Sequence, residues 1–500
     1  MDIPQQINSV VFTESKLQLL KLWQWSVSAV CEDEETGIFK VLLRGSYFNG
    51  GGVSTFLNPD GTRLTPMEFD YIDDFHDGLA KVAMQGKGYG FISSSGEIIA
   101  PVVYEDAGFF HNNFSQVKKN GEWMLIDRYG KEISLPRKYK DFGWMSNGRC
   151  RVSTMKITGW ADLAYYSDNE HYAGLWGFID ESGKEIIEPQ YIYAMDFEDG
   201  LAVVCKGEWK ETNGKYWNNG ELWGVIDING KEVIPCQYDE IDFFNDAPGI
   251  FKVHTGGWKS GKWGVMDGTG KWIAPPVFNN ISYDYQNGLF VFYENRNVPG
   301  DEFRDALYGV YDIPNQKILF EPQFTDVYFM KNGLFCIETV DSEANGTERI
   351  IDRTGKEVFA SDYSGIRYYH EPYVVNKGLH EDALYGVINT DGSVVLPCKY
   401  KTPWGGISCE DQTIIFIEDG RQGIMDFNEN ILIPADKQEI SRLATDLYLF
   451  KKDNSYGIVL KSGQIVLPAE YEKISLCRNN RIIIANGKNV VEVFEIKEVS

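Results

Sequence analysis

Short apolar runs bounded by polar turn residues recur along most of the chain, and their pattern predicts strands rather than helices. In the stretch Leu175 to Gly207 (LWGFIDESGKEIIEPQYIYAMDFEDGLAVVCKG), the runs at 177–179 and 201–204 are apolar at consecutive positions. A strand that is apolar on both alternating faces must be covered on both sides. The pattern therefore predicts small antiparallel meanders, each packed between neighbouring copies.

The copies align on a step of an aromatic residue followed by glycine. It occurs at Tyr89-Gly90, Trp176-Gly177, Trp223-Gly224, Trp263-Gly264, Tyr308-Gly309, Tyr385-Gly386 and Tyr456-Gly457, with Trp123-Met124 as a variant. An Asp-x-x-Gly turn then follows in most copies, as at Asp180 and Gly183. The Asp side chain accepts a hydrogen bond from an amide in the turn, and glycine adopts the positive φ that closes a hairpin. A later proline, such as Pro189, predicts a strand end or a bulge.

These repeats predict an all-β fold of tandem antiparallel β-meander or hairpin repeats, in an open superhelical or propeller-like array. The open array is favoured, because about ten copies exceed the four to eight blades of most propellers. Residues 1–54 are expected to be an N-terminal cap, 55–475 the tandem repeats with their insertions, and 476–500 C-terminal capping strands. Within the first segment, Thr13 to Trp25 (TESKLQLLKLWQW) is predicted to be a short amphipathic helix.

The chain resembles the WG-repeat proteins, a bacterial class named for the aromatic-glycine step. The resemblance rests on WGFIDESGKEIIEPQY (176–191), WGVIDINGKEVIPCQYD (223–239) and WGVMDGTGKWIAPPVF (263–278). It implies a tandem β-repeat and a role as an interaction module, and it carries over no catalytic residue. Function is thus expected outside the repeated residues themselves.

Insertions interrupt the repeat at one place, between the strand that follows a Gly-Leu step and the next aromatic-glycine step. Equivalent loops of a stacked array emerge on one side, so the insertions predict a loop-bearing edge. Those at 154–174, 208–221 and 254–261 carry the candidate binding residues, which are Trp160, Tyr165, Tyr166, Tyr172, Trp209, Tyr216, Trp217 and Trp258. Such rings stack on sugars or anchor a protein partner. The alternative is that long hairpins pack these rings on one another.

Composition narrows the range of partners. A formal net charge of −25 repels phosphate groups, which argues against nucleic acid and anionic membranes. No apolar run of about 18 residues occurs, so no membrane-spanning helix is expected. The N-terminus lacks the pattern of a secretory signal, and the eight cysteines form no C-x-x-C motif. We therefore expect a cytoplasmic protein.

Motifs for catalysis, metals and cofactors are absent or incomplete. Gly256 to Lys262 (GGWKSGK) has phosphate-loop spacing, but Trp263 follows where Ser or Thr is required. The sequence contains no G-x-S-x-G, and no two histidines flank a carboxylate at metal-ligand spacing. We thus expect no cofactor, no metal and no enzyme. The favoured function is a non-enzymatic scaffold that presents its loop-bearing edge to a protein or peptide. The alternatives are a carbohydrate-binding module and a glycan-acting hydrolase with a distant carboxylate pair.

Overall fold

The structure is a computed structural model in which the named elements of the described residues are all strands. It describes residues 5–14, 17–25, 27, 29–44, 52–154, 174–212, 215–244, 247–257, 260–295, 306–330, 333–340, 346–358, 363–367, 371–378, 382–403, 406–477, 482–488 and 490–498. Every element assigned in these ranges is a strand, from β1 to β46, which confirms the all-β prediction. No helix of these ranges is long and apolar enough to cross a membrane.

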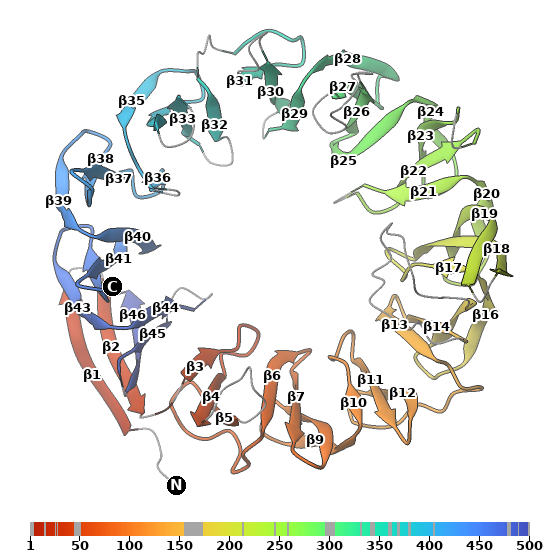
Figure 1. Cartoon of the computed structure of the whole chain (residues 1–500), viewed down its shortest axis with the longest axis horizontal. Coiled ribbons are helices and arrows are strands. Elements are labelled where there is room, and N and C mark those ends of the chain that lie inside the picture. Colours follow the sequence, from red (N-terminus) through yellow and green to blue (C-terminus); the bar gives the residue numbers. More distant parts are fainter. Residues whose placement is uncertain are drawn as a thin grey trace. The chain divides into compact units, whose positions relative to one another are not determined.

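The described strands form twelve antiparallel sheets, most of them four-stranded meanders in chain order (Figure 1). The sheets in the first half of the chain are β3 (Ala29–Glu32), β4 (Phe39–Arg44) and β5 (Val53–Leu57); β6 (Tyr71–His76), β7 (Leu79–Met84), β8 (Gly88–Ser93) and β9 (Ile98–Tyr104); β10 (Asp106–Ala107), β11 (Phe114–Lys119) and β12 (Glu122–Asp127); β13 (Asp141–Ser146), β14 (Arg149–Ser153), β15 (Trp176–Asp180) and β16 (Glu185–Tyr191); and β17 (Tyr193–Ala194), β18 (Leu201–Thr212), β19 (Lys215–Asp227) and β20 (Glu232–Tyr238).

The meanders continue with the same order in the second half. They are β21 (Glu240–Phe243), β22 (Ile250–Thr255), β23 (Lys262–Asp267) and β24 (Trp272–Phe278); β25 (Asn280–Gln286), β26 (Leu289–Asn295), β27 (Ala306–Asp312) and β28 (Lys317–Phe324); β29 (Asp326–Phe329), β30 (Phe335–Val340) and β31 (Gly346–Ile351); β32 (Gly365–Arg367), β33 (Tyr373–Lys377), β34 (Leu384–Ile388) and β35 (Val394–Tyr400); β36 (Ile407–Ser408), β37 (Thr413–Glu418), β38 (Arg421–Asp426) and β39 (Ile431–Lys437); and β40 (Glu439–Ala444), β41 (Leu447–Lys452), β42 (Ser455–Leu460) and β43 (Ile465–Tyr471).

The remaining sheet joins the two ends of the chain. It contains β1 (Gln5–Glu14), β2 (Leu17–Trp25), β44 (Lys473–Leu476), β45 (Ile482–Asn486) and β46 (Val491–Glu498), in the order β1-β2-β46-β45-β44 (Figure 1). The fold is thus of the β-propeller type, the alternative that the number of copies had made less favoured. The chain divides into two compact units, a terminal unit (Met1–Gly86, Ile92–Ile98 and Tyr328–Ser500) and a central unit (Lys87–Phe91 and Ile99–Val327).

The helix predicted from Thr13 to Trp25 is wrong. Thr13 and Glu14 end β1, and Leu17–Trp25 form β2, which pairs with β1 on one side and with β46 on the other. A helix of this length is marginal in isolation. Two antiparallel partners satisfy the same backbone groups over the length of β2, and this tertiary pairing overrides the local pattern.

Each sequence repeat contributes to two neighbouring sheets. The repeat at 175–207 supplies β15 and β16 to one sheet and then β17 and the start of β18 to the next. Its buried side chains form one cluster across this boundary, with Trp176 and Phe178 on one side and Phe197 and Val204 on the other. The hydrophobic core therefore lies between adjacent sheets, as the doubly apolar strands predicted.

The glycine of the aromatic-glycine step is required by close backbone approach. Trp176 pairs with Tyr191 and Phe178 pairs with Ile187, so Gly177 lies opposite three residues of β16, with Pro189 among them. A Cβ atom on Gly177 would lie 2.4 Å from the Ile187 carbonyl oxygen and 2.6 Å from the Pro189 nitrogen. The proline thus marks a bulge rather than a strand end, and glycine opposite it leaves room for the bulged strand.

The Asp-x-x-Gly turns have the predicted geometry. The Asp180 carboxylate accepts hydrogen bonds from the Ser182 amide (2.9 Å) and the Lys184 amide (3.0 Å), and Gly183 has a φ of +83°. Asp352 accepts the same kind of bonds from Thr354 and Lys356, and the Thr354 hydroxyl adds a bond of 2.6 Å. These aspartates close hairpins, which accounts for their recurrence without a metal or a catalytic role.

The Asp352 turn predicts a pH-dependent contribution to stability. The Thr354 hydroxyl and amide hold the pKa of Asp352 below its usual value. A carboxyl with a lowered folded-state pKa stabilises the fold above its unfolded-state pKa of about 4, and this contribution is lost as the pH falls through the folded-state value. We expect Asp352→Ala to unfold at lower urea concentration than wild type at neutral pH, with a difference that narrows below about pH 4. A difference independent of pH would contradict this explanation.

Candidate functional site

In the central unit, polar side chains link neighbouring sheets. Three of them occupy the same repeat position, the third residue of the second strand of a sheet. At this position of β11, Gln116 donates from Nε2 to the Phe142 carbonyl oxygen on β13 (2.9 Å). On β14, the Arg151 guanidinium donates to the Ala194 carbonyl oxygen on β17 (2.5 Å). On β22, the Lys252 ammonium lies 3.3 Å from the centre of the Tyr283 ring on β25. Each of these side chains links its sheet to the next one.

A second set of bridges joins the turns themselves. The Asn112 amide donates from Nδ2 to the Met145 carbonyl oxygen (2.7 Å), and the Ser146 hydroxyl donates to the Phe197 carbonyl oxygen (2.6 Å). Asn112 lies in the turn before β11, and Ser146 is the last residue of β13. The acceptors are Met145 on β13 and Phe197, three residues after the end of β17. The next junction, between β17–β20 and β21–β24, has Glu198 at the position of Ser146. An ionised carboxylate has no proton to donate to the Phe244 carbonyl oxygen.

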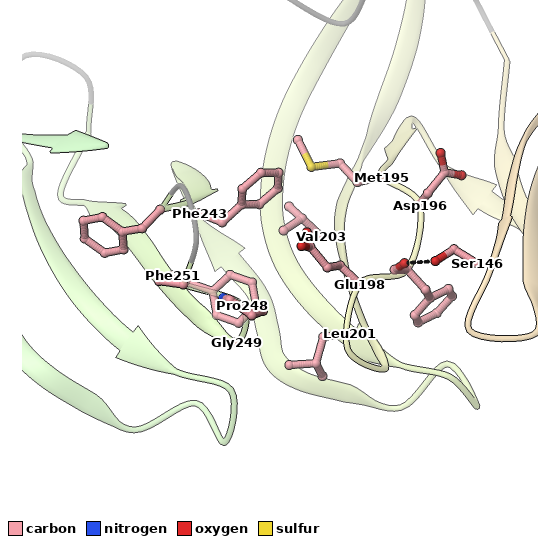
Figure 2. A pocket seen from close by; sticks show the side chains of 13 residues that line it. Ser146, Met195, Asp196, Glu198, Leu201, Val203, Phe243, Pro248, Gly249 and Phe251 are labelled. Carbon is pink, nitrogen blue, oxygen red and sulfur yellow. Dashed lines mark hydrogen bonds between the residues drawn. The ribbon is translucent and has the colours of Figure 1, made fainter. Parts of the chain in front are cut away.

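A cavity of about 730 Å³ lies at this junction. Val203 of β18 has the repeat position of Gln116, Arg151 and Lys252, and it has no polar group with which to reach β21. Figure 2 shows that Val203 and Leu201 line the cavity from β18, and that Phe243 and Phe251 line it from the next sheet. At this junction Val203 and Glu198 thus stand at the positions that Arg151 and Ser146 have at the preceding junction, and Val291 of β26 is likewise apolar at the position of Val203.

The lining of the cavity is mainly apolar. The sheet β17–β20 contributes Met195, Phe197, Leu201 and Val203, and the sheet β21–β24 with its turn contributes Phe243, Phe244, Ala247, Pro248, Gly249 and Phe251. Val203 and Phe251 belong to one buried cluster and form the floor, and Met195, Leu201 and Phe243 are only half-buried. The polar residues are Ser146, Asp196 and Glu198, so no lining residue carries a positive charge.

The two carboxylates of the lining have different surroundings. Asp196 lies 3.3 Å from the Arg151 guanidinium, and its burial raises the pKa of its carboxyl while Arg151 opposes that effect. Arg151 also stacks on the Trp176 ring, 4.5 Å from its centre. Glu198 is exposed, and its carboxylate has no cationic partner among the described residues. The unbalanced charge of the cavity is thus that of Glu198.

The two carboxylates of the lining do not face each other across the cavity (Figure 2). Figure 2 shows the Glu198 side chain directed toward the cavity, whereas the Asp196 carboxylate is directed away from it. A glycosidase requires two carboxylates on either side of the scissile bond. In the described ranges, no group of three or more His, Cys, Asp or Glu side chains is placed to hold a metal ion. The cavity offers apolar surface and hydrogen-bond acceptors.

The structure describes few of the aromatic residues predicted to bind. Trp160, Tyr165, Tyr166, Tyr172 and Trp258 lie outside the described residues, as do the side chains of Tyr216 and Trp217. The insertion at 208–221 is a hairpin in which β18 and β19 continue, with Glu211 paired to Tyr216 and Lys210 to Trp217. Trp209 is half-buried, and its indole nitrogen donates to the Gly174 carbonyl oxygen (2.9 Å).

The cavity and the hairpin lie at opposite ends of β18. Leu201 and Val203, near the start of this strand, line the cavity, and Trp209 lies close to its other end. Sequence reasoning missed the cavity because its apolar residues have the types expected of the repeat. Two signals were present nonetheless. Val203 stands where three aligned copies have Gln116, Arg151 and Lys252 and a fourth has Val291, and the sequence from Phe244 to Gly249 spans five positions where Phe197 to Gly200 spans three.

Comparison with known proteins identifies the repeat. The profile described as "WG containing repeat" matches residues 55–87, 89–123, 176–216, 223–253, 263–297, 308–339 and 385–402. No curated protein sequence matches the chain.

Three solved structures that are similar to the chain have low sequence identity to it. A eukaryotic initiation factor is 10% identical with a TM-score of 0.32, and the match covers 67% of this chain and 87% of that one. The tricorn protease is 10% identical with a TM-score of 0.23, covering 100% and 61%. An uncharacterised protein from Listeria monocytogenes EGD-e is 9% identical with a TM-score of 0.25, covering 71% and 93%. At these TM-scores none of the three bears on function.

Proposed function

Because the chain belongs to the WG containing repeat family, whose recurring residues act here in packing and turns, we propose that it is a non-enzymatic binding or scaffold protein for a protein or peptide partner. The observation that supports this proposal most is the cavity between β17–β20 and β21–β24. It is concave, apolar and open at the junction where Val203 and Glu198 stand at the positions of Arg151 and Ser146. Binding sites commonly combine such a surface with few polar groups.

The cavity replaces the insertion edge as the favoured binding surface. Leu201 and Val203 of β18, Phe243 of β21 and Phe251 of β22 line it, and half-buried Met195, Leu201 and Phe243 offer apolar contact to a ligand. On the hairpin, by contrast, the one described aromatic side chain, Trp209, already has a partner for its indole nitrogen. The hairpin remains a second candidate surface, because β18 and β19 extend it beyond the sheet.

The variant Val203→Arg tests the proposal. It places at this junction the residue type that Arg151 provides at the preceding junction. An arginine at 203 would reach toward the Ile241 carbonyl oxygen, which is equivalent to the Ala194 oxygen that accepts from Arg151. Its side chain would occupy part of the cavity, and the urea unfolding midpoint of the variant checks that it folds before binding is compared. Val203→Ile, which adds one methyl group, is the matched control.

Partner capture from the native host with full-length protein gives the readout. We expect wild type and Val203→Ile to retain the same partner and Val203→Arg to lose it. Phe243→Ala, which removes one half-buried wall of the cavity, should weaken capture by at least about tenfold. If Val203→Arg retained the partner and a variant with a shortened hairpin at 208–221 lost it, the binding site would lie at the insertion edge instead. Failure of folded wild type to retain any partner would contradict the binding function itself.

A further inference from the structure

We propose that the cavity recognises a peptide segment in which an apolar side chain is flanked by lysine or arginine. This inference rests on the proposed peptide-binding function and specifies its ligand. The apolar side chain enters between Val203 and Phe243, and the basic side chain donates to the Glu198 carboxylate at the rim.

The depth and size of the cavity define the apolar part of the ligand. Val203 and Phe251 form a buried floor with exposed fractions of 2% and 5%. The volume of 730 Å³ is within the range of about 300–1,000 Å³ typical of ligand sites. It accommodates a leucine or aromatic side chain together with the residues on either side. Removing that side chain from water supplies the main driving force.

The polar part of the ligand is defined by the hydrogen-bond acceptor of the cavity that has no partner among the described residues. In the wall, the Met195 amide donates to the Val203 carbonyl oxygen (2.9 Å) and the Glu198 amide to the Leu201 carbonyl oxygen (2.8 Å). Arg151 neutralises Asp196. Glu198 is then the lining charge without a described cationic partner, and it can only accept hydrogen bonds. A ligand that complements it must carry a proton donor, and a cationic donor gives the stronger bond.

Charge disfavours the alternative of an acidic or phosphorylated peptide. No cationic side chain lines the cavity, and the formal net charge of the chain is −25. An anionic group near Glu198 would meet repulsion both locally and from the whole protein. The same charge raises the association rate of a basic peptide, and this effect should decrease as salt is added.

Selection from a random heptapeptide library on full-length protein tests the inference. Wild type is the bait, and peptides that also bind Val203→Arg are discarded. We expect the remaining peptides to contain an apolar residue next to lysine or arginine. Peptides that depend on Val203 but lack basic residues would overturn the inference and leave the proposed function intact. Absence of any Val203-dependent peptide would contradict both.

A double-mutant cycle then locates the basic residue. Fluorescence anisotropy compares one selected peptide with its Lys→Gln version on wild type and on Glu198→Gln. Each single change should weaken binding about three- to fivefold, and the two together should weaken it no further. Glu188→Gln removes the same charge from an exposed site on β16 and should have no effect. Independent, multiplicative effects of the two changes would overturn the contact with Glu198.

Discussion

Replacing Gly177 with alanine should lower the free energy of unfolding by about 3 kcal/mol. The reason is contact with backbone, which cannot move aside as the end of a side chain can. The new Cβ would lie 2.4 Å from the Ile187 carbonyl oxygen and 2.8 Å from the Glu188 carbonyl carbon. Relief requires β15 and the bulge of β16 to separate, and this separation disturbs the core on both sides. Urea unfolding followed by tryptophan fluorescence measures the loss.

Gly121→Ala is the control for this prediction. Gly121 has a φ of +76°, and a Cβ atom there would have no neighbour within 4 Å. Alanine at this turn therefore has only a conformational cost, of about 1 kcal/mol. If Gly177→Ala were no more destabilising than Gly121→Ala, close approach would not explain the glycine of the aromatic-glycine step.

The second large effect is expected at a buried ion pair of the terminal unit, where Asp411→Ala should cost about 2–3 kcal/mol. The Asp411 carboxylate is 1% exposed and lies 2.6 Å from the Arg442 guanidinium. It also accepts a hydrogen bond from the Tyr448 hydroxyl (3.2 Å), whose oxygen lies 2.8 Å from the Thr413 hydroxyl. Alanine leaves the guanidinium without its buried partner. Partial exposure of Arg442, at 31%, keeps the cost below that of a fully buried charge.

An exposed ion pair of the same unit is the matched control. Lys401 and Asp382 are 3.5 Å apart, and their side chains are 53% and 95% exposed. Asp382→Ala should change stability by less than about 0.5 kcal/mol. High salt should leave the Asp411→Ala effect largely unchanged, because buried pairs are little screened. If Asp411→Ala and Asp382→Ala lowered the free energy of unfolding equally, burial of the Asp411 pair would not explain its contribution to stability.

The strands and turns of the repeat could be predicted from the sequence because they depend on residues that are close together in the chain. The turn at Asp180 and Gly183 depends on a side chain and a φ value within five residues, and both could be read from the spacing. The doubly apolar run at 201–204 predicted cover on both sides, which the clusters around Val203 and Val204 confirm. The role of Gly177 could not be read in this way, because its constraint comes from β16, which lies across the sheet.

In the terminal segments, the local hydrophobic pattern does not predict the secondary structure. Residues 17–25 form β2 because β46, more than 460 residues later in the chain, pairs with them. The cavity was missed for a related reason. Val203 looks like an ordinary core residue until it is compared with Arg151 and Lys252, whose side chains reach a neighbouring sheet. Bridges between sheets leave no mark in the hydrophobic pattern of a single repeat.

We propose that a partner binds at the cavity end of β18 rather than at the hairpin end. Amide hydrogen exchange of the full chain, with and without its captured partner, tests this most directly. We expect new protection at residues 195–203 and 247–251, which line the cavity, and none at 207–222. Protection of 207–222 with no change at 195–203 would contradict the claim.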